Sequence, residues 1–295
     1  VDMEIVPSKI QLVNISGNTL EGDIFYVKNK INYIESAKIE NTSTTIKDFF
    51  QNNSVETKVM NSYYGSDVNT PINLKNEKTI FSDESTIETA YQYAYEKGNQ
   101  KLIDANMVGI PLDTEVKKDG KTISKAETKY DNPVNLLPSS VLSYNMQSNT
   151  PSTEVTYDIY DGKRNLIQYT TKAGVSTSII WGYNQTQPIA KIEGAKLSDI
   201  TQTLINSIVN ASDDTNANYS ESTLLNQLDA FRIALPNFQI STYTYKPLIG
   251  VTTITPPSGI REYYFYDTAN RLESVKTNEN GVLTTLKEYQ YHYKP

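Results

Sequence analysis

The sequence predicts a mainly β protein built of antiparallel hairpins that form a curved sheet or shell wall. Three observations support this fold class. Tyr, Thr, Val and Ile recur at every second position of many short runs, which is typical of half-buried strands. A strand–turn–strand pattern repeats along the chain. One segment alone, near residues 197–235, changes to helical spacing and predicts an inserted helical hairpin.

The alternating runs define the expected strands. These runs cover residues 87–95, 116–130, 175–183, 240–245, 263–266 and 283–293. The run over 116–130 contains Asp119-Gly120, a pair that readily adopts the positive φ angles of a two-residue hairpin turn. We expect an irregular β-rich segment over 1–85 and a more regular repeat region over 86–295, with one continuous domain as the alternative.

Residues 197–235 carry two apolar stripes at helical spacing. The first stripe runs from Leu197 to Val209, with Ser198 placed to cap the helix, and the second runs from Leu224 to Leu235 before Pro236. Between them lies a polar linker that includes Asp213-Asp214, which we expect to be a solvated loop. Amphipathic helices usually face their own core, so both stripes are expected to pack on the sheet. Short helical turns are also expected near 45–50 and 100–105.

The composition excludes several kinds of site. The chain has 295 residues, no cysteine and a single histidine, His292, so thiolate chemistry and multi-histidine metal sites are excluded and a Ser-His-Asp triad is disfavoured. A net charge of -7 argues against a nucleic-acid surface, and no run approaches eighteen apolar residues, so no membrane span is expected. We therefore expect no catalytic residue, no metal ligand and no cofactor.

Two segments share one template of Tyr-Asp, two variable residues, a turn residue, a polar residue and Leu. The first contains Tyr160, Asp161, Asn165 and Leu166, followed by the turn glycine Gly174. The second contains Tyr266, Asp267, Asn270, Arg271 and Leu272, followed by Gly281. Tyr and Leu can face the core, while Asp can accept hydrogen bonds from backbone amides in the turn. We expect a structural role for all eleven residues.

These residues resemble the YD repeat of RHS-type proteins, whose unit reads approximately Tyr-Asp-x-x-Gly-Arg-Leu. Asn270 stands at the glycine position of the second copy and Arg164 at that of the first. The segments Trp181-Gly182-Tyr183-Asn184 and Pro247-Leu248-Ile249-Gly250 are similar to the C-terminal portion of large RHS-repeat proteins of Bacteroidota. The resemblance covers residues ~90–295 and implies a β wall on an exported or surface-attached protein. The self-cleavage of some RHS shells occurs near an Asp-Pro junction, which this chain lacks.

The sequence thus predicts a non-catalytic, structural wall segment of a large protein that is extracellular or attached to the cell surface. Its expected partners are the upstream part of the same protein, another chain or the export machinery, contacted through a sheet edge in the first strands, near residues 5–35. Two other functions stay open. An exposed aromatic row would favour a glycan- or surface-binding adhesin module, and an enclosed apolar lumen would favour a shell around a toxin or partner polypeptide.

Overall fold

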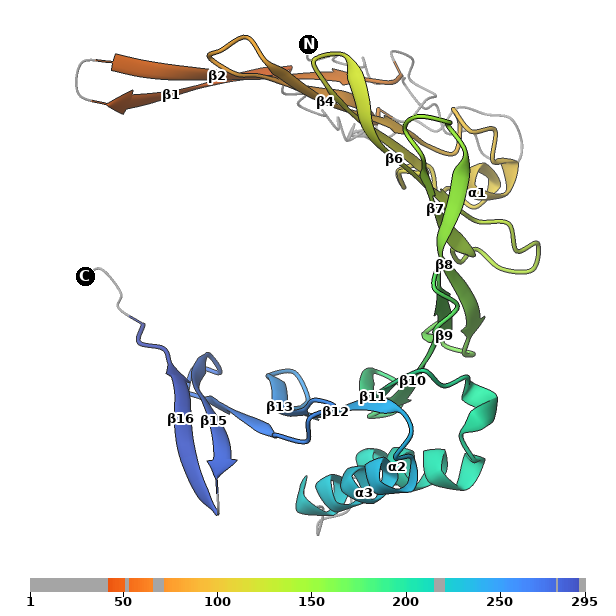
Figure 1. Cartoon of the computed structure of the whole chain (residues 1–295), viewed down its shortest axis with the longest axis vertical. Coiled ribbons are helices and arrows are strands. Elements are labelled where there is room, and N and C mark those ends of the chain that lie inside the picture. Colours follow the sequence, from red (N-terminus) through yellow and green to blue (C-terminus); the bar gives the residue numbers. More distant parts are fainter. Residues whose placement is uncertain (1–41, 51–52, 66–71, 215–220, 280, 292–295) are drawn as a thin grey trace, which may run out of the picture. The chain divides into compact units, whose positions relative to one another are not determined.

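The computed structural model describes residues 42–50, 53–65, 72–214, 221–279 and 281–291. Within these residues, antiparallel strands form one sheet in which every strand is hydrogen-bonded to its neighbours in sequence (Figure 1). The first eight strands are β1 (Ser43–Phe50), β2 (Asn53–Tyr63), β3 (Leu74–Ile80), β4 (Thr86–Gln92), β5 (Asp113–Lys118), β6 (Lys121–Lys129), β7 (Ser140–Tyr144) and β8 (Pro151–Tyr160). The other eight are β9 (Leu166–Thr171), β10 (Ser176–Gly182), β11 (Gln187–Glu193), β12 (Gln239–Lys246), β13 (Gly250–Thr255), β14 (Glu262–Tyr266), β15 (Leu272–Glu279) and β16 (Val282–Glu288). The mainly β, antiparallel fold class is confirmed.

The hairpin of β5 and β6 shows how the sequence directs this sheet. Asp119 has φ 49° and Gly120 has φ 77°, so both turn residues are left-handed. Lys118 and Lys121 face each other directly across the two strands. This is the two-residue connection whose twist matches that of the flanking strands.

One of the two expected short helical turns is wrong. Residues 45–50 lie in β1, which pairs with β2 along its whole length from Ser43 opposite Met60 to Phe50 opposite Asn53. The β-branched run Thr44-Thr45-Ile46 favours this extended conformation. The other expected turn is the helix α1 (Gln100–Asp104), where the side chain of Asn99 accepts a hydrogen bond from the amide of Leu102.

The helical insertion consists of a 3-10 turn, η1 (Leu197–Asp199), and two helices, α2 (Gln202–Asp213) and α3 (Glu221–Ala234). Ser198 lies inside η1 and therefore does not cap α2, which begins after Thr201. The expected packing on the sheet is present, since α2 contacts β10 and β11 and α3 contacts β12. None of the described helices has the length and apolarity needed to cross a membrane.

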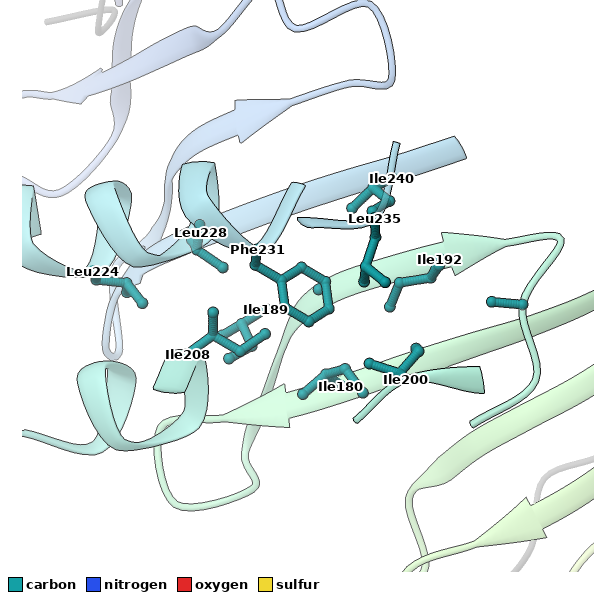
Figure 2. Close-up of a cluster of buried hydrophobic side chains, with 12 residues drawn as sticks. Ile180, Ile189, Ile192, Ile200, Ile208, Leu224, Leu228, Phe231, Leu235 and Ile240 are labelled. Carbon is teal, nitrogen blue, oxygen red and sulfur yellow. The ribbon is translucent and has the colours of Figure 1, made fainter. Parts of the chain in front are cut away.

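The principal hydrophobic core lies between these helices and β10–β12 (Figure 2). Phe231 of α3 is 1% exposed and shares this core with Leu228 and Ile208 from the helices and Ile189 and Ile192 from β11. A smaller core gathers Ala94, Leu102 and Leu112 around α1. Most of the apolar stripe of each helix is thus buried within the fold, as the helical spacing predicted, although Ile233 of α3 stays 79% exposed.

Arg232 fixes the end of α3 to the sheet. Its guanidinium donates hydrogen bonds to the carbonyl oxygens of Ile240, Thr255 and Pro256, the last at 2.8 Å. Burial lowers the pKa of this guanidinium, although Asp229 nearby acts in the opposite direction. The planar fork of arginine suits such multiple contacts, so Arg232 connects one helix to two strands.

Candidate functional site

The first Tyr-Asp segment forms a tight turn that is closed by its aspartate. Oδ1 of Asp161 accepts hydrogen bonds from the amides of Lys163 at 2.9 Å and Asn165 at 2.8 Å. Its backbone oxygen accepts from the amide of Arg164 at 3.0 Å. Arg164, at the glycine position, has φ 70°. The turn therefore forms although its left-handed residue is an arginine, a conformation that L side chains disfavour by about 1–2 kcal/mol.

The second segment repeats this geometry at equivalent positions. Oδ1 of Asp267 accepts from the amides of Ala269 at 2.8 Å and Arg271 at 2.9 Å, and Asn270 has φ 60°. The side chain of Arg271 also pairs with Asp267 at 2.6 Å and lies over the ring of Tyr291. Two hydrogen bonds from Arg271 hold the pKa of Asp267 below its usual value. The bond from the side chain has the larger effect, and the bond from the backbone amide adds to it.

Leu166 and Leu272 are half-buried at the start of the strand that follows each turn. The two turn glycines lie one hairpin further on, Gly174 with φ 77° and Gly281 with φ 84°. The structure therefore places nine of the eleven sequence-predicted residues in two copies of one hairpin corner, and the two glycines in the turn at the far end of the strand that follows. The copies lie on separate strands, so they form two structural corners and not one site.

The tyrosines of both copies form hydrogen bonds to the backbone of a neighbouring segment. The hydroxyl of Tyr160 donates to the carbonyl of Pro138 at 2.8 Å, and that of Tyr266 donates to the carbonyl of Val251 at 2.9 Å. Three further tyrosine hydroxyls donate to strand carbonyls in the same way: Tyr64 to Tyr91, Tyr93 to Leu74, and Tyr291 to Leu272. A buried tyrosine needs such a partner for its hydroxyl. These bonds explain five of the 22 tyrosines as part of the sheet.

Gly250 makes room for one of these tyrosines. A Cβ added at Gly250 would meet the hydroxyl of Tyr266 and lie 2.8 Å from its Cζ. The preceding residues Pro247 and Leu248 turn the chain, with Leu248 at φ 67°. The Pro-Leu-Ile-Gly segment and the second Tyr-Asp copy are thus parts of one packing arrangement, which could not be read from the sequence because about fifteen residues separate them.

A cluster of charges on β5 and β6 was not predicted. Asp113 and Glu127 are directly opposite in the register and are 4% and 5% exposed. Lys97 bridges them, at 3.5 Å from Asp113 and 2.9 Å from Glu127. Lys125, Lys129 and Tyr144 complete the cluster. The alternating acidic and basic residues of 113–129 are the sequence feature that could have indicated it.

The electrostatics of this cluster keep Glu127 ionised. Burial alone would raise its pKa, but hydrogen bonds from Lys97, Tyr144 and Lys129 outweigh burial and lower the pKa to about 2. The hydrogen bond to Glu127, helped by burial, raises the pKa of Tyr144 to about 12. At neutral pH Glu127 is thus an anion with no proton to donate, and Tyr144 keeps its proton. The arrangement suits an ion-pair network better than acid–base chemistry.

The outer strand β16 is exposed along its whole length, as is β1 over residues 43–49 at the other edge of the described sheet. Every residue of β16 is exposed, and Val282, Leu283 and Leu286 are 66%, 46% and 51% exposed. Successive residues of a strand point to opposite faces, so Leu283 and its neighbour Val282 leave apolar surface on both faces. Within the described residues β16 pairs with β15 alone.

On the opposite side of the sheet β1 is the outer strand. The edge expected near residues 5–35 lies outside the described residues, as does His292.

Comparisons with known proteins give distant structural matches. No family model and no curated protein matches the chain. Among solved structures, it is similar to a chain of the TcdB2–TccC3–Cdc42 structure and of the TcdB2–TccC3 structure without the hypervariable C-terminal region, each with 12% identity and a TM-score of 0.36. A Photorhabdus luminescens Tc holotoxin pore with a TccC3 mutation matches with 12% identity and a TM-score of 0.33. Each match covers 80% of this chain and 12% of the other.

Proposed function

We propose that this chain is a non-catalytic wall segment of a larger RHS/YD-repeat protein of the Bacteroidota type, exported to the cell surface. The observation that carries the proposal is the sheet itself. Each strand adds to the one before it, and two Tyr-Asp corners of the same geometry turn the chain between strands. A sheet of this kind can be extended by adding hairpins at its edge. We therefore expect it to be one part of a longer sheet.

The exposed strand β16 supports a covered edge in the complete protein. An outer strand presents backbone N–H and C=O groups on one side, and native proteins usually cover or blunt such an edge. In β16, apolar side chains remain exposed on both faces. A further strand, from the same protein, a second chain or the export machinery, would pair with the backbone and bury Val282 and Leu286.

The proposal can be tested by amide hydrogen exchange. The 295-residue chain is compared with the protein purified from its native source, together with any polypeptide that is attached to it there. We expect those amides of 282–288 that face away from β15 to exchange rapidly in the isolated chain and slowly in the native assembly. The interior strand β11 is the internal control and should be protected in both. Equal, rapid exchange of 282–288 in both samples would overturn the wall-segment proposal.

The absence of catalysis is part of the same proposal. A carboxylate-only glycosidase needs one carboxylic acid that is still protonated at working pH. In the buried pair of Asp113 and Glu127, Glu127 is not protonated at neutral pH, because its pKa is lowered to about 2. We expect no turnover of a panel of oligosaccharides. Turnover that disappeared in Glu127→Gln or Asp113→Asn, and persisted in the control Glu193→Gln on β11, would refute this part.

A further inference from the structure

A groove lies where the first Tyr-Asp corner, the turn between β10 and β11 and the helix α2 come together. Its volume is about 520 Å³, within the range of small-molecule sites in proteins. Its apolar lining comes from the strands and from the inner face of α2, including Ile179 and Ile205. Four amide residues line it, Asn184 and Gln185 on the turn and Gln202 and Asn206 on α2, together with the charged residues Asp161, Lys163 and Asp213. The two Tyr-Asp turns do not need these four amide side chains to form.

The turn at the rim of the groove has an unusual backbone. Tyr183, Asn184 and Gln185 are consecutive and all left-handed, with φ of 52°, 58° and 62°. A left-handed conformation costs most L residues about 1–2 kcal/mol and asparagine less, so the strain falls mainly on Tyr183 and Gln185, and strain of this kind concentrates at functional sites and ligand clamps. The structure therefore maintains an unfavourable conformation that places two amide side chains in the lining of the groove.

Neighbouring elements hold this turn in place. Asp213 of α2 accepts a hydrogen bond from the amide of Asn184 at 2.7 Å, so Asp213 is part of a fixed contact and not only of a solvated linker. From the Tyr-Asp corner, Lys163 donates to the carbonyl of Asn184 and Asn165 donates to the carbonyl of Gln185 at 2.9 Å. The rim is thus preorganised, which lowers the entropic cost of binding a ligand.

Trp181 provides the aromatic surface of the groove and is the only tryptophan in the chain. Its Nε1 donates to the carbonyl of Leu166 at 3.0 Å, which fixes the indole, and the side chain stays partly exposed. On α2, Nε2 of Gln202 donates to Oδ1 of Asn206 at 2.8 Å. After that bond, the Gln202 carbonyl can still accept and the Asn206 amide group can still donate, so the pair offers both functions to a ligand.

We propose that this groove binds a neutral carbohydrate, a segment of one to three sugar rings. Sugar rings have apolar C–H faces, which pack on aromatic surface such as Trp181, and hydroxyl groups that both donate and accept hydrogen bonds, as the amides do. The charged side chains do not favour an acidic ligand. Lys163 is already bonded to Asn184, and Asp161 and Asp213 contribute negative charge to the lining.

This inference is independent of the wall-segment proposal and of the tyrosine content. It predicts a glycan contact beside the first Tyr-Asp corner, formed by the helical insertion together with the strands it covers. The insertion would then add a binding surface to a sheet that is otherwise structural. A peptide bound in the same groove is the competing occupant, and the experiment distinguishes the two.

The single tryptophan makes the test specific. The full chain is titrated with neutral trisaccharides of glucose, mannose, xylose and N-acetylglucosamine, with Trp181 fluorescence and calorimetry as readouts. We expect at least one sugar to change the fluorescence and to release heat with the same dissociation constant. Asn206→Ala should weaken that binding roughly five- to tenfold, the usual effect of losing one hydrogen bond. The matched control Asn226→Ala, at an exposed position of α3 outside the groove, should leave it unchanged.

Three outcomes would overturn the proposal. The first is no response to any sugar at millimolar concentration. The second is sugar binding that Asn206→Ala and Asn226→Ala affect equally, which would place the site elsewhere. The third is a fluorescence response to members of a peptide library and to none of the sugars. Circular dichroism of both variants establishes that they are folded, so a loss of binding in Asn206→Ala alone supports the groove as the site.

Discussion

Gly250→Ala tests whether the second Tyr-Asp corner depends on the close approach of Tyr266 to the start of β13. The added Cβ would lie 2.8 Å from Cζ and 3.3 Å from Cε1 of the tyrosine ring. Carbon atoms in contact prefer about 3.5–4.0 Å, so the ring must retreat by roughly 1 Å. That movement also strains or breaks the 2.9 Å hydrogen bond from the Tyr266 hydroxyl to the Val251 carbonyl.

The size of the effect follows from these two contributions. Overpacking of this kind costs about 1–3 kcal/mol, and the loss of one hydrogen bond costs about 0.5–1.5 kcal/mol. We expect Gly250→Ala to lower the free energy of unfolding by about 2–3 kcal/mol. In a unit of this size, that corresponds to a fall in the melting temperature of about 4–12 °C. Gly162→Ala is the matched control, because an added Cβ there meets no atom within 4 Å.

A double-mutant cycle separates the clash from other effects of the new methyl group. When Tyr266→Ala removes the ring, Gly250→Ala should cost little more, so the two substitutions together should be less damaging than the sum of the single effects by about 2 kcal/mol. Unfolding by urea, followed by circular dichroism, gives all four free energies. Strict additivity of the two substitutions would refute the proposed packing of Tyr266 against Gly250.

The remaining predictions concern the second turn, the core and the charge cluster. Asn270→Val should destabilise the protein by about 1–2 kcal/mol because a β-branched residue resists φ 60°, whereas Asn270→Gly should not; an unchanged melting temperature for the valine variant would contradict the turn. Phe231→Ala should cost about 3–5 kcal/mol in urea unfolding, and a loss below 1 kcal/mol would contradict its central place in the core. The lowered pKa of Glu127 contributes stability that is complete above pH ~4.5 and is lost as the pH falls toward 2. Glu127→Gln should therefore weaken the acid dependence of unfolding, measured as midpoints between pH 2 and 6, and an identical profile would exclude this linkage.

Local patterns in the sequence located seven of the sixteen described strands and predicted the form of several turns. Alternation of β-branched and aromatic residues located strands, and Asp119-Gly120 and Asn270 indicated left-handed turn positions. These features depend on residues close together in the chain, where sterics and short hydrogen bonds decide the conformation. The same reasoning misplaced the cap of α2 at Ser198 and expected a helical turn within β1. Pairing with β2 sets the conformation of β1, and a preceding 3-10 turn sets the start of α2.

By itself, the sequence determined a cysteine-free antiparallel β protein with repeated Tyr-Asp corners and a helical insertion, because period, turn chemistry and composition are local properties. Only the tertiary structure decided what those parts contact. It paired Gly250 with Tyr266, set Asp113 opposite Glu127, and brought Trp181 and Asn206 to one groove from segments about twenty-five residues apart. Such contacts depend on strand register and helix packing, which are set when the whole sheet assembles. No periodic pattern in the sequence indicates them.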